Sequence, residues 1–315
     1  MTSIIKRVAT GPELSKSISY EESRAGMRLV LEGLADPVQA AVFLIGLRMK
    51  RETDDENKGI LQGIRDKTKT VVADVDELVD IADPYNGYGR SLPSSPFLPV
   101  LLAESGVPAV SHGVETVGPK FGVTHHQILQ AAGVSVELTG EEAGKQISNL
   151  EIGWAYVDQS QFCPSLFGMA EFRKKIVKRA AISTAEVLTG PVRGRNKTHL
   201  LTGYVHNEYP PIYTMLARHS GFNSAFLMRG TEGCVTPSLR KRSEFVRYWE
   251  QSEDVVVEAD PSKIGIEQEN RPEPIPHALM PIIDREFGPD ENNAEIAKLA
   301  AKEGLAAIEG KKFHL

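Results

Sequence analysis

Residues 19–60, SYEESRAGMRLVLEGLADPVQAAVFLIGLRMKRETDDENKGI, contain three helix starts in succession and decide the first part of the fold. The segments Ser19–Glu22 and Thr53–Glu56 have the spacing of a capping box, in which two side chains satisfy each other's backbone N–H groups. Between them, Asp36-Pro37 combines a capping residue with a proline at the first helical position. No part of the stretch alternates with the period of two that is typical of a strand. It predicts a bundle of helices.

After about residue 75, short apolar runs alternate with amphipathic segments of helix length. Strands that are separated by helices indicate a parallel sheet covered on both faces. The expected strands are 78–82, 107–111, 152–157, 199–205, 224–228 and 254–259, and the expected helices lie near 96–105, 125–132, 165–178, 210–220 and 293–308.

The predicted fold class is therefore α/β, with a small N-terminal all-α domain and a larger, doubly covered, mostly parallel sheet domain. We place the first domain at 1–75 and the second at 76–315, with helical segments near 165–180 packing on the first. The helix VQAAVFLIGLRM is apolar over more than one face, which predicts that it also buries a partner.

The composition is that of an ordinary globular protein, with 41% apolar and 25% charged residues. A net charge of −6 argues against a wholly basic nucleic-acid coat but leaves room for a local basic groove. The two cysteines, Cys163 and Cys234, lack the spacing of a zinc site and favour a cytoplasmic location. No window approaches the roughly 18 apolar residues of a membrane span, so no membrane partner is expected.

The segment DPYNGYGRSLPSSP, residues 83–96, follows an expected strand and leads into an expected helix. In an open parallel sheet, such loops bind ligands because the helix N-terminus offers free N–H groups to an anion. Gly87 and Gly89 permit close backbone approach, and Ser94 and Ser95 can cap the helix or donate to an anion. A phosphate site and a plain strand-to-helix turn both fit this loop.

Three segments together resemble the anthranilate phosphoribosyltransferase family and its nucleoside-phosphorylase relatives. They are residues 20–60, ESGVPAVSHGV (104–114) and FCPSLFGMAEFRKKIVKR (162–179). The resemblance implies a homodimer and the transfer of a phosphoribosyl group from phosphoribosyl pyrophosphate (PRPP) to anthranilate, with magnesium. The closest similarity is to the divergent second branch of the family, which is associated with nucleic-acid binding.

The chain departs from the family at the motifs that hold PRPP and magnesium. The pyrophosphate loop GTGGD matches residues 83–87, where Asp83 would place a negative charge against a negative ligand. Only Ser95 is kept from the motif NIST, and the lysine of KHGN is Ser111. The magnesium-binding acids of the family match Val235 and Thr236. We therefore predict no metal or other cofactor, and magnesium only if the chain is a transferase after all.

The residues that remain form a candidate site. The predicted phosphate-binding residues are Asn86, Gly87, Arg90, Ser94, Ser95, His112 and Gly113. The resemblance implies that Arg173 and Arg179 contact the acceptor, although they could also form the solvated basic face of a helix. Adjacent histidines in THHQ, residues 124–127, point in different directions on a helix and do not indicate a metal site.

Basic clusters support a second hypothesis, in which the partner is single-stranded nucleic acid. Each cluster taken alone also fits ordinary solvated charge. Beside the two arginines just named, the clusters contain Lys174, Lys175, Lys178, Arg193, Arg195, Lys197, Arg240, Lys241 and Arg242. The sequence leaves three functions open: binding of a phosphate-bearing small molecule, binding of nucleic acid, and phosphoribosyl transfer to anthranilate or another aromatic acceptor.

Overall fold

The computed structural model describes residues 1–11, 13–280 and 291–310. Its N-terminal helices are α1 (Thr2–Val8), α2 (Tyr20–Leu31), α3 (Pro37–Lys50) and α4 (Asp54–Arg65). Both predicted capping boxes are present, and the Asp36 side chain accepts the N–H groups of Val38 and Gln39 at the start of α3. The sequence therefore fixes the first turns of three helices through local hydrogen bonds.

The main sheet has seven strands in the order β4-β3-β2-β6-β7-β8-β9. The first five are parallel and the last two pairings are antiparallel, so the predicted fold class is confirmed. The strands are β2 (Glu77–Ala82), β3 (Ala109–Gly113), β4 (Trp154–Asp158), β6 (Lys197–Tyr204), β7 (Ser224–Arg229), β8 (Ser243–Trp249) and β9 (Val255–Ala259), and β1 (Val71–Val72) pairs with β5 (Val192–Arg193) in a separate sheet.

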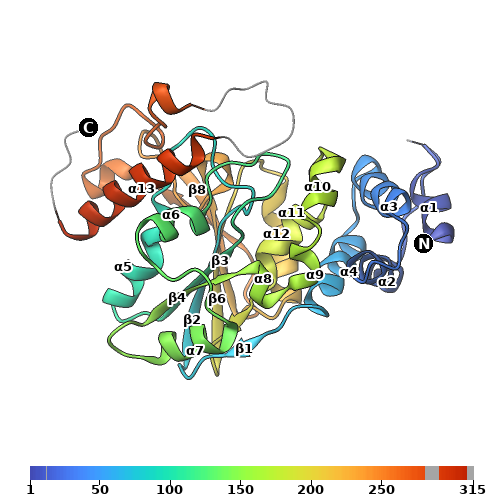
Figure 1. Cartoon of the computed structure of the whole chain (residues 1–315), viewed down its shortest axis with the longest axis horizontal. Coiled ribbons are helices and arrows are strands. Elements are labelled where there is room, and N and C mark those ends of the chain that lie inside the picture. Colours follow the sequence, from blue (N-terminus) through green and yellow to red (C-terminus); the bar gives the residue numbers. More distant parts are fainter. Residues whose placement is uncertain (12, 281–290, 311–315) are drawn as a thin grey trace.

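Helices cover both faces of the main sheet (Figure 1). The α-helices of this part are α5 (Leu98–Glu104), α6 (His125–Ala131), α7 (Gly140–Ser148), α8 (Gln159–Phe162), α9 (Pro164–Phe167), α10 (Ala170–Ile176), α11 (Ile182–Ala185), α12 (Tyr209–His219) and α13 (Asn293–Ile308). The 3-10 turns are η1 (Ser95–Phe97), η2 (Glu186–Leu188), η3 (Thr231–Gly233), η4 (Pro261–Ile264) and η5 (His277–Leu279).

Three sequence predictions need correction. The single helix expected at 165–178 is two short helices, because α9 already ends at Phe167. Helix α10 ends at Ile176, and the next residue, Val177, has a left-handed φ of 64°. Strand β8 was not predicted, since its charged residues were interpreted as a basic cluster. Helix α7 was also missed, although Thr139 and Glu142 form a capping box at its start.

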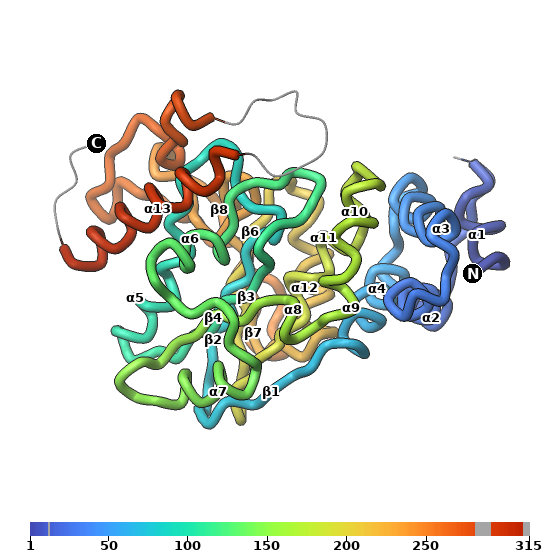
Figure 2. The backbone as a smooth tube through the Cα atoms, viewed as in Figure 1, coloured from blue at the N-terminus to red at the C-terminus, as the bar shows by residue number. Residues whose placement is uncertain are grey.

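Side chains of β2 alternate between two apolar layers, as the period of a strand requires. Leu78 and Ala82 join the large core that also contains residues of α4, α11 and α12. Ile81 lies in the opposite layer, which Leu98 and Leu102 of α5 complete. Figure 2 shows the helical N-terminal segment at one end of the molecule and α13, which packs on α6, toward the other.

In the part of the chain that the structure describes, no helix is both long and apolar enough to cross a membrane.

Candidate functional site

Polar side chains gather where β2, β3 and β4 end. Asp80 and Asp83 lie in and just after β2, His112 lies near the end of β3, and Asp158 is the last residue of β4. All four residues are buried. Because parallel strands end at the same edge of a sheet, residues far apart in sequence meet there.

Asp83 is the centre of a buried hydrogen-bond network. One carboxylate oxygen lies 2.9 Å from Nε2 of His125 and also accepts the hydroxyls of Tyr88 and Ser95. The other oxygen accepts the backbone N–H of Val235 at 3.0 Å. Burial alone would raise the pKa of Asp83, but His125 and the hydroxyl donors hold it below its usual value.

The expectation that Asp83 directs a negative charge at a ligand is therefore wrong. Its carboxylate points inward, is about 3% exposed, and is satisfied by the protein itself. Ser95 donates to Asp83 and also lies 2.9 Å from His125. Ser94 is exposed and begins the turn before α5 without a side-chain capping bond.

A second buried chain of polar groups contains Asp80, His112 and Tyr85. Nε2 of His112 lies 2.8 Å from Asp80, and Nδ1 is hydrogen-bonded to the Tyr85 hydroxyl. Burial, together with the carboxylates of Glu186 and Asp80, raises the pKa of Tyr85 well above its usual value. The predicted site residue His112 is thus fixed on both ring nitrogens. Gly113, the next residue of β3, is buried against Tyr156.

The two histidines at the start of α6 serve different partners. His125 contacts Asp83, whereas Nδ1 of His126 lies 2.9 Å from Asp158. The prediction that these side chains diverge is confirmed, and Thr124 forms a capping box with Gln127 at this helix start. Sequence reasoning missed both histidines as site residues. Their acidic partners lie 42 and 32 residues away, so no local spacing indicated the pairs.

The two glycines of the loop have different roles. Gly87 has a φ of +72°, and a Cβ there would lie 2.5 Å from the carbonyl oxygens of Gly122 and Val123. It therefore permits close packing against another loop. A Cβ at Gly89 would meet only the Lys120 side chain, at 3.5 Å. The buried Asn86 accepts the N–H of Gly122 through its backbone carbonyl at 3.0 Å.

The backbone of residues 89–91 binds a carboxylate from the chain itself. Three consecutive N–H groups, those of Gly89, Arg90 and Ser91, donate to Glu232 at 3.1, 3.1 and 3.2 Å. The Ser91 hydroxyl donates at 2.9 Å, and Lys120 forms an ion pair with the same carboxylate. Consecutive N–H groups that converge in this way form a concave anion site, often called a nest. The loop does bind an anion, and Glu232 is that anion.

Burial would raise the pKa of Glu232, but the ion pair with Lys120 and the donors of the loop keep it below its usual value. Burial also lowers the pKa of Lys120, with Arg179 adding to the effect and Glu232 opposing it. The predicted site residue Arg90 has an exposed side chain beside this pair.

Arg173 is a buried arginine with an internal partner. Its guanidinium makes a two-pronged ion pair with Glu186, at 2.6 and 2.7 Å. The alternative in which it belongs to a solvated face is therefore wrong. Both terminal nitrogens of the guanidinium donate to Glu186, so Arg173 could contact the carboxylate of an acceptor substrate only if Glu186 were displaced. Arg179, by contrast, is exposed.

Most of the predicted nucleic-acid contacts lie in two clusters that have local partners. Arg195 pairs with Asp74 and Asp76, and Lys197 pairs with Glu250. Arg242 pairs with Asp260 at 2.8 Å. Its neighbours Arg240 and Lys241 are exposed.

Arg193, from the same group, does not face solvent as a free cation. Its guanidinium donates to the carbonyl oxygens of Gly190 and Ser220 and stacks on the ring of Phe222. Burial lowers its pKa to about 10. This arginine holds backbone together, which corrects its assignment as a nucleic-acid contact.

The cluster at the end of α10 differs from the other two. Lys175, Lys178 and Arg179 are exposed and Lys174 is half-buried. Within the described ranges, no acidic side chain forms an ion pair with any of them. These side chains form a basic surface that is available to a partner, as do the exposed Arg240 and Lys241.

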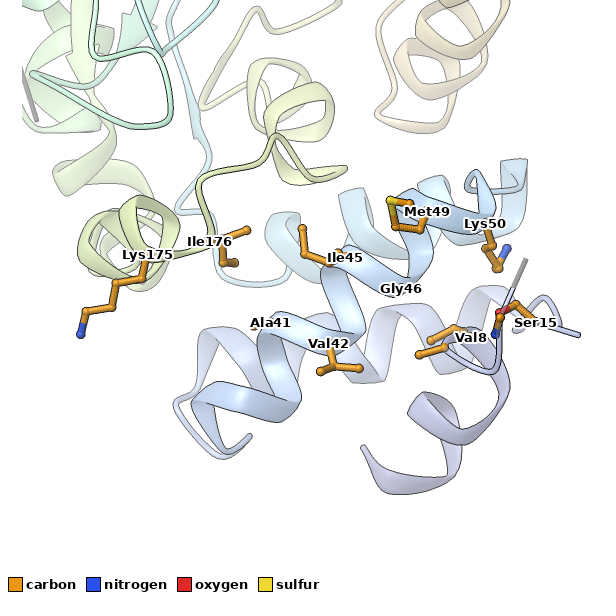
Figure 3. Close-up of a pocket in the computed structure, with 12 residues that line it drawn as sticks. Val8, Ser15, Ala41, Val42, Ile45, Gly46, Met49, Lys50, Lys175 and Ile176 are labelled. Carbon is orange, nitrogen blue, oxygen red and sulfur yellow. The ribbon is translucent and has the colours of Figure 1, made fainter. Parts of the chain in front are cut away.

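A groove of about 600 Å³ is lined by α3, by the end of α1 and the segment after it, and by two residues of α10 (Figure 3). Apolar side chains of α3, including Val42, Ile45 and Met49, form one wall. Ile176 closes the other side, and Lys175 points away from it toward solvent. Val38 and Met49 expose 71% and 78% of their surface. The apolar face predicted for α3 is thus present and uncovered within one chain.

Comparison with known proteins agrees with this architecture. Residues 2–68 match the helical bundle domain of a glycosyl transferase family. The matched residues contain the four N-terminal helices, and the mostly parallel sheet follows them in the chain.

Sequence relatives of the chain include anthranilate phosphoribosyltransferases. The chain is 28% identical to anthranilate phosphoribosyltransferase of Cupriavidus necator over 71% of its own length and 64% of that enzyme. It is 24% identical to the enzyme of Rhodopseudomonas palustris over 84% of its length and 74% of the relative. The chain is thus similar to anthranilate phosphoribosyltransferases in sequence and in fold. The matched region spans less than two thirds of the Cupriavidus enzyme.

Solved structures share the fold across nearly the whole chain. The enzyme of Thermus thermophilus superposes with a TM-score of 0.66 at 20% identity, covering 98% of this chain and 90% of that one. The Saccharomyces cerevisiae enzyme, solved in complex with PRPP and Mg, gives 0.70 at 15% identity, covering 100% and 82%.

Proposed function

We propose that this chain uses the anthranilate phosphoribosyltransferase fold to bind a phosphate-bearing ligand, without making phosphoribosyl anthranilate. The contact between Asp83 and Val235 carries the proposal. Asp83 stands where the family has a small pyrophosphate-binding glycine, and Val235 stands where it has a magnesium-binding acid. The backbone N–H of Val235 donates to the Asp83 carboxylate, so each group has its hydrogen-bond partner within the protein.

The residues at this position do not fit magnesium. Magnesium prefers carboxylate oxygens and water, and Val235 offers no side-chain oxygen. The nearby carboxylates of Asp83 and Glu232 are engaged by His125 and Lys120. Among the residues that the structure describes, no three His, Cys, Asp or Glu side chains form a group that could hold a metal ion. We therefore propose no magnesium-dependent step.

The unpaired cations at the end of α10 favour a second candidate, the binding of single-stranded nucleic acid. Lys175, Lys178 and Arg179 are exposed and lack acidic partners in the described ranges. Phosphate contacts of this kind are independent of base sequence and sensitive to salt. This function would agree with the nucleic-acid association of the family branch that the chain most resembles.

We further propose that the chain acts as a homodimer in the cytoplasm. The uncovered apolar groove between α3 and α10 supports the dimer, since a second copy would bury side chains such as Val38 and Met49. Both cysteines are unpaired, which accords with a reducing compartment.

Calorimetric titration with PRPP, with and without magnesium, tests the main proposal. We expect any heat of binding to be the same in both conditions and expect no product with anthranilate. The triple variant Asp83→Gly, Val235→Asp, Thr236→Glu serves as the comparison, because it returns the family residues. Magnesium-dependent PRPP binding by the unaltered chain, with formation of phosphoribosyl anthranilate, would overturn the proposal and support the transferase alternative.

A further inference from the structure

The anion nest at residues 89–91 has more donors than its present occupant needs. Three backbone N–H groups, the Ser91 hydroxyl and the Lys120 ammonium all converge on one carboxylate. A carboxylate has two oxygens, whereas a terminal phosphoryl group presents three and carries a larger charge. The donor set therefore suits a phosphoryl group at least as well as it suits Glu232.

Glu232 reaches the nest from a different part of the chain and at a conformational cost. It lies in η3, 141 to 143 positions from its backbone donors. Its φ of 59° and ψ of 10° are left-handed, which costs a residue with a side chain free energy that a glycine does not pay. Its carboxylate is only 8% exposed. Binding in the nest offsets both the backbone strain and the loss of hydration.

The surroundings become strongly positive once Glu232 leaves. Lys120 loses the acidic partner with which it forms an ion pair. Arg90, whose backbone N–H is one of the donors, has an exposed side chain. An incoming anion would therefore meet several cations, with no other carboxylate on these donors in the described part of the chain.

We propose that Glu232 is an exchangeable internal anion, which occupies a binding site for the terminal phosphoryl group of a small molecule and is displaced when that ligand binds. The proposal deepens the proposed binding of a phosphate-bearing ligand by naming the donors and the group that competes with it. Displacement lowers the apparent affinity of the ligand, because part of its binding free energy replaces the contacts of Glu232.

The test is a calorimetric titration of the full chain with inorganic pyrophosphate, comparing the unaltered protein with Glu232→Ala. We expect at least a tenfold gain in affinity for Glu232→Ala and the loss of that gain in Glu232→Ala with Lys120→Ala. Glu244→Ala is the matched control, since it removes one exposed acidic charge from β8 and should leave affinity unchanged. Circular dichroism checks the fold, and Glu232→Gln, which keeps the side-chain shape, should show a smaller gain.

The proposal would be overturned if Glu232→Ala bound pyrophosphate no more tightly than the unaltered chain. An equal gain in affinity for Glu244→Ala would also overturn it. A larger gain for a 5′-phosphorylated oligonucleotide than for pyrophosphate would overturn the assignment to a small molecule. The two proposals fail separately. If Glu232→Ala binds pyrophosphate but the unaltered protein binds no PRPP, the result supports the phosphoryl site at residues 89–91 and not the proposed function. If the unaltered protein binds PRPP but Glu232→Ala shows no gain in affinity for pyrophosphate, only the proposed function is supported.

Discussion

Asp83 and Val235 are 152 positions apart in sequence, yet the backbone N–H of Val235 donates to the Asp83 carboxylate at 3.0 Å. The contact joins the loop after β2 to the segment that follows η3. Replacing Asp83 with glycine would leave the N–H of Val235 without its acceptor and His125 without its acidic partner in a buried site.

We predict that Asp83→Asn lowers the melting temperature at pH 7 and that this difference shrinks as the solution is acidified below about pH 4. The folded protein lowers the pKa of Asp83, so its stabilising effect is present above the pKa of the unfolded chain and is lost as pH falls through the folded pKa. Thermal unfolding measured across this pH range gives the result. Asp74→Asn, at an exposed ion pair, is the control and should change little at any pH. A constant difference across pH would contradict the prediction.

Arg173→Ala should destabilise the chain by about 3–5 kcal/mol, because it leaves the buried Glu186 without its partner. Adding Glu186→Ala should recover part of that loss. Urea unfolding measures both effects. Arg195→Ala, whose side chain is 51% exposed, should cost no more than about 1 kcal/mol. If the single Arg173 variant were as mild as this control, the ion pair would contribute little to the fold.

Gly87→Ala should cost more than Gly221→Ala. Both glycines have positive φ, +72° and +82°, so each substitution carries a similar backbone strain of roughly 1 kcal/mol. At Gly87 the new Cβ would also press against two carbonyl oxygens at 2.5 Å, whereas nothing lies within 4 Å at Gly221. The difference between their free energies of unfolding reports the packing of the two loops. Equal costs would mean that the loops separate easily.

The basic surface of α10 gives a prediction for the second candidate function. Lys175→Ala, Lys178→Ala and Arg179→Ala together should reduce the salt dependence of single-stranded DNA binding by about two in the log–log slope, at roughly 0.7 for each lost contact. Fluorescence anisotropy at several salt concentrations measures the slope. Arg195→Ala with Arg242→Ala alters cations that are already paired and should leave it unchanged. The reverse pattern would place nucleic acid on the other clusters.

The sequence by itself determined the elements whose signals are local. Capping residues set the starts of α2, α3, α4 and α6, and α13 spans Asn293–Ile308 as its periodicity predicted. Each of these features depends on groups within four residues of one another, so the sequence pattern alone indicates it. Helix α7 carries a signal of the same local kind, the capping box of Thr139 and Glu142, and β8 has an alternating burial pattern.

Only the tertiary structure decided what the candidate site contains. The pairs of Asp83 with His125 and of Arg173 with Glu186 depend on how strands and helices meet, not on spacing along the chain. The same is true of Glu232, whose carboxylate fills the anion nest of a loop far away in sequence. A buried charge must find its compensating partner in three dimensions, because desolvation makes an unpaired one too costly. Residue type therefore predicted where charge would lie, and packing determined which group neutralises it.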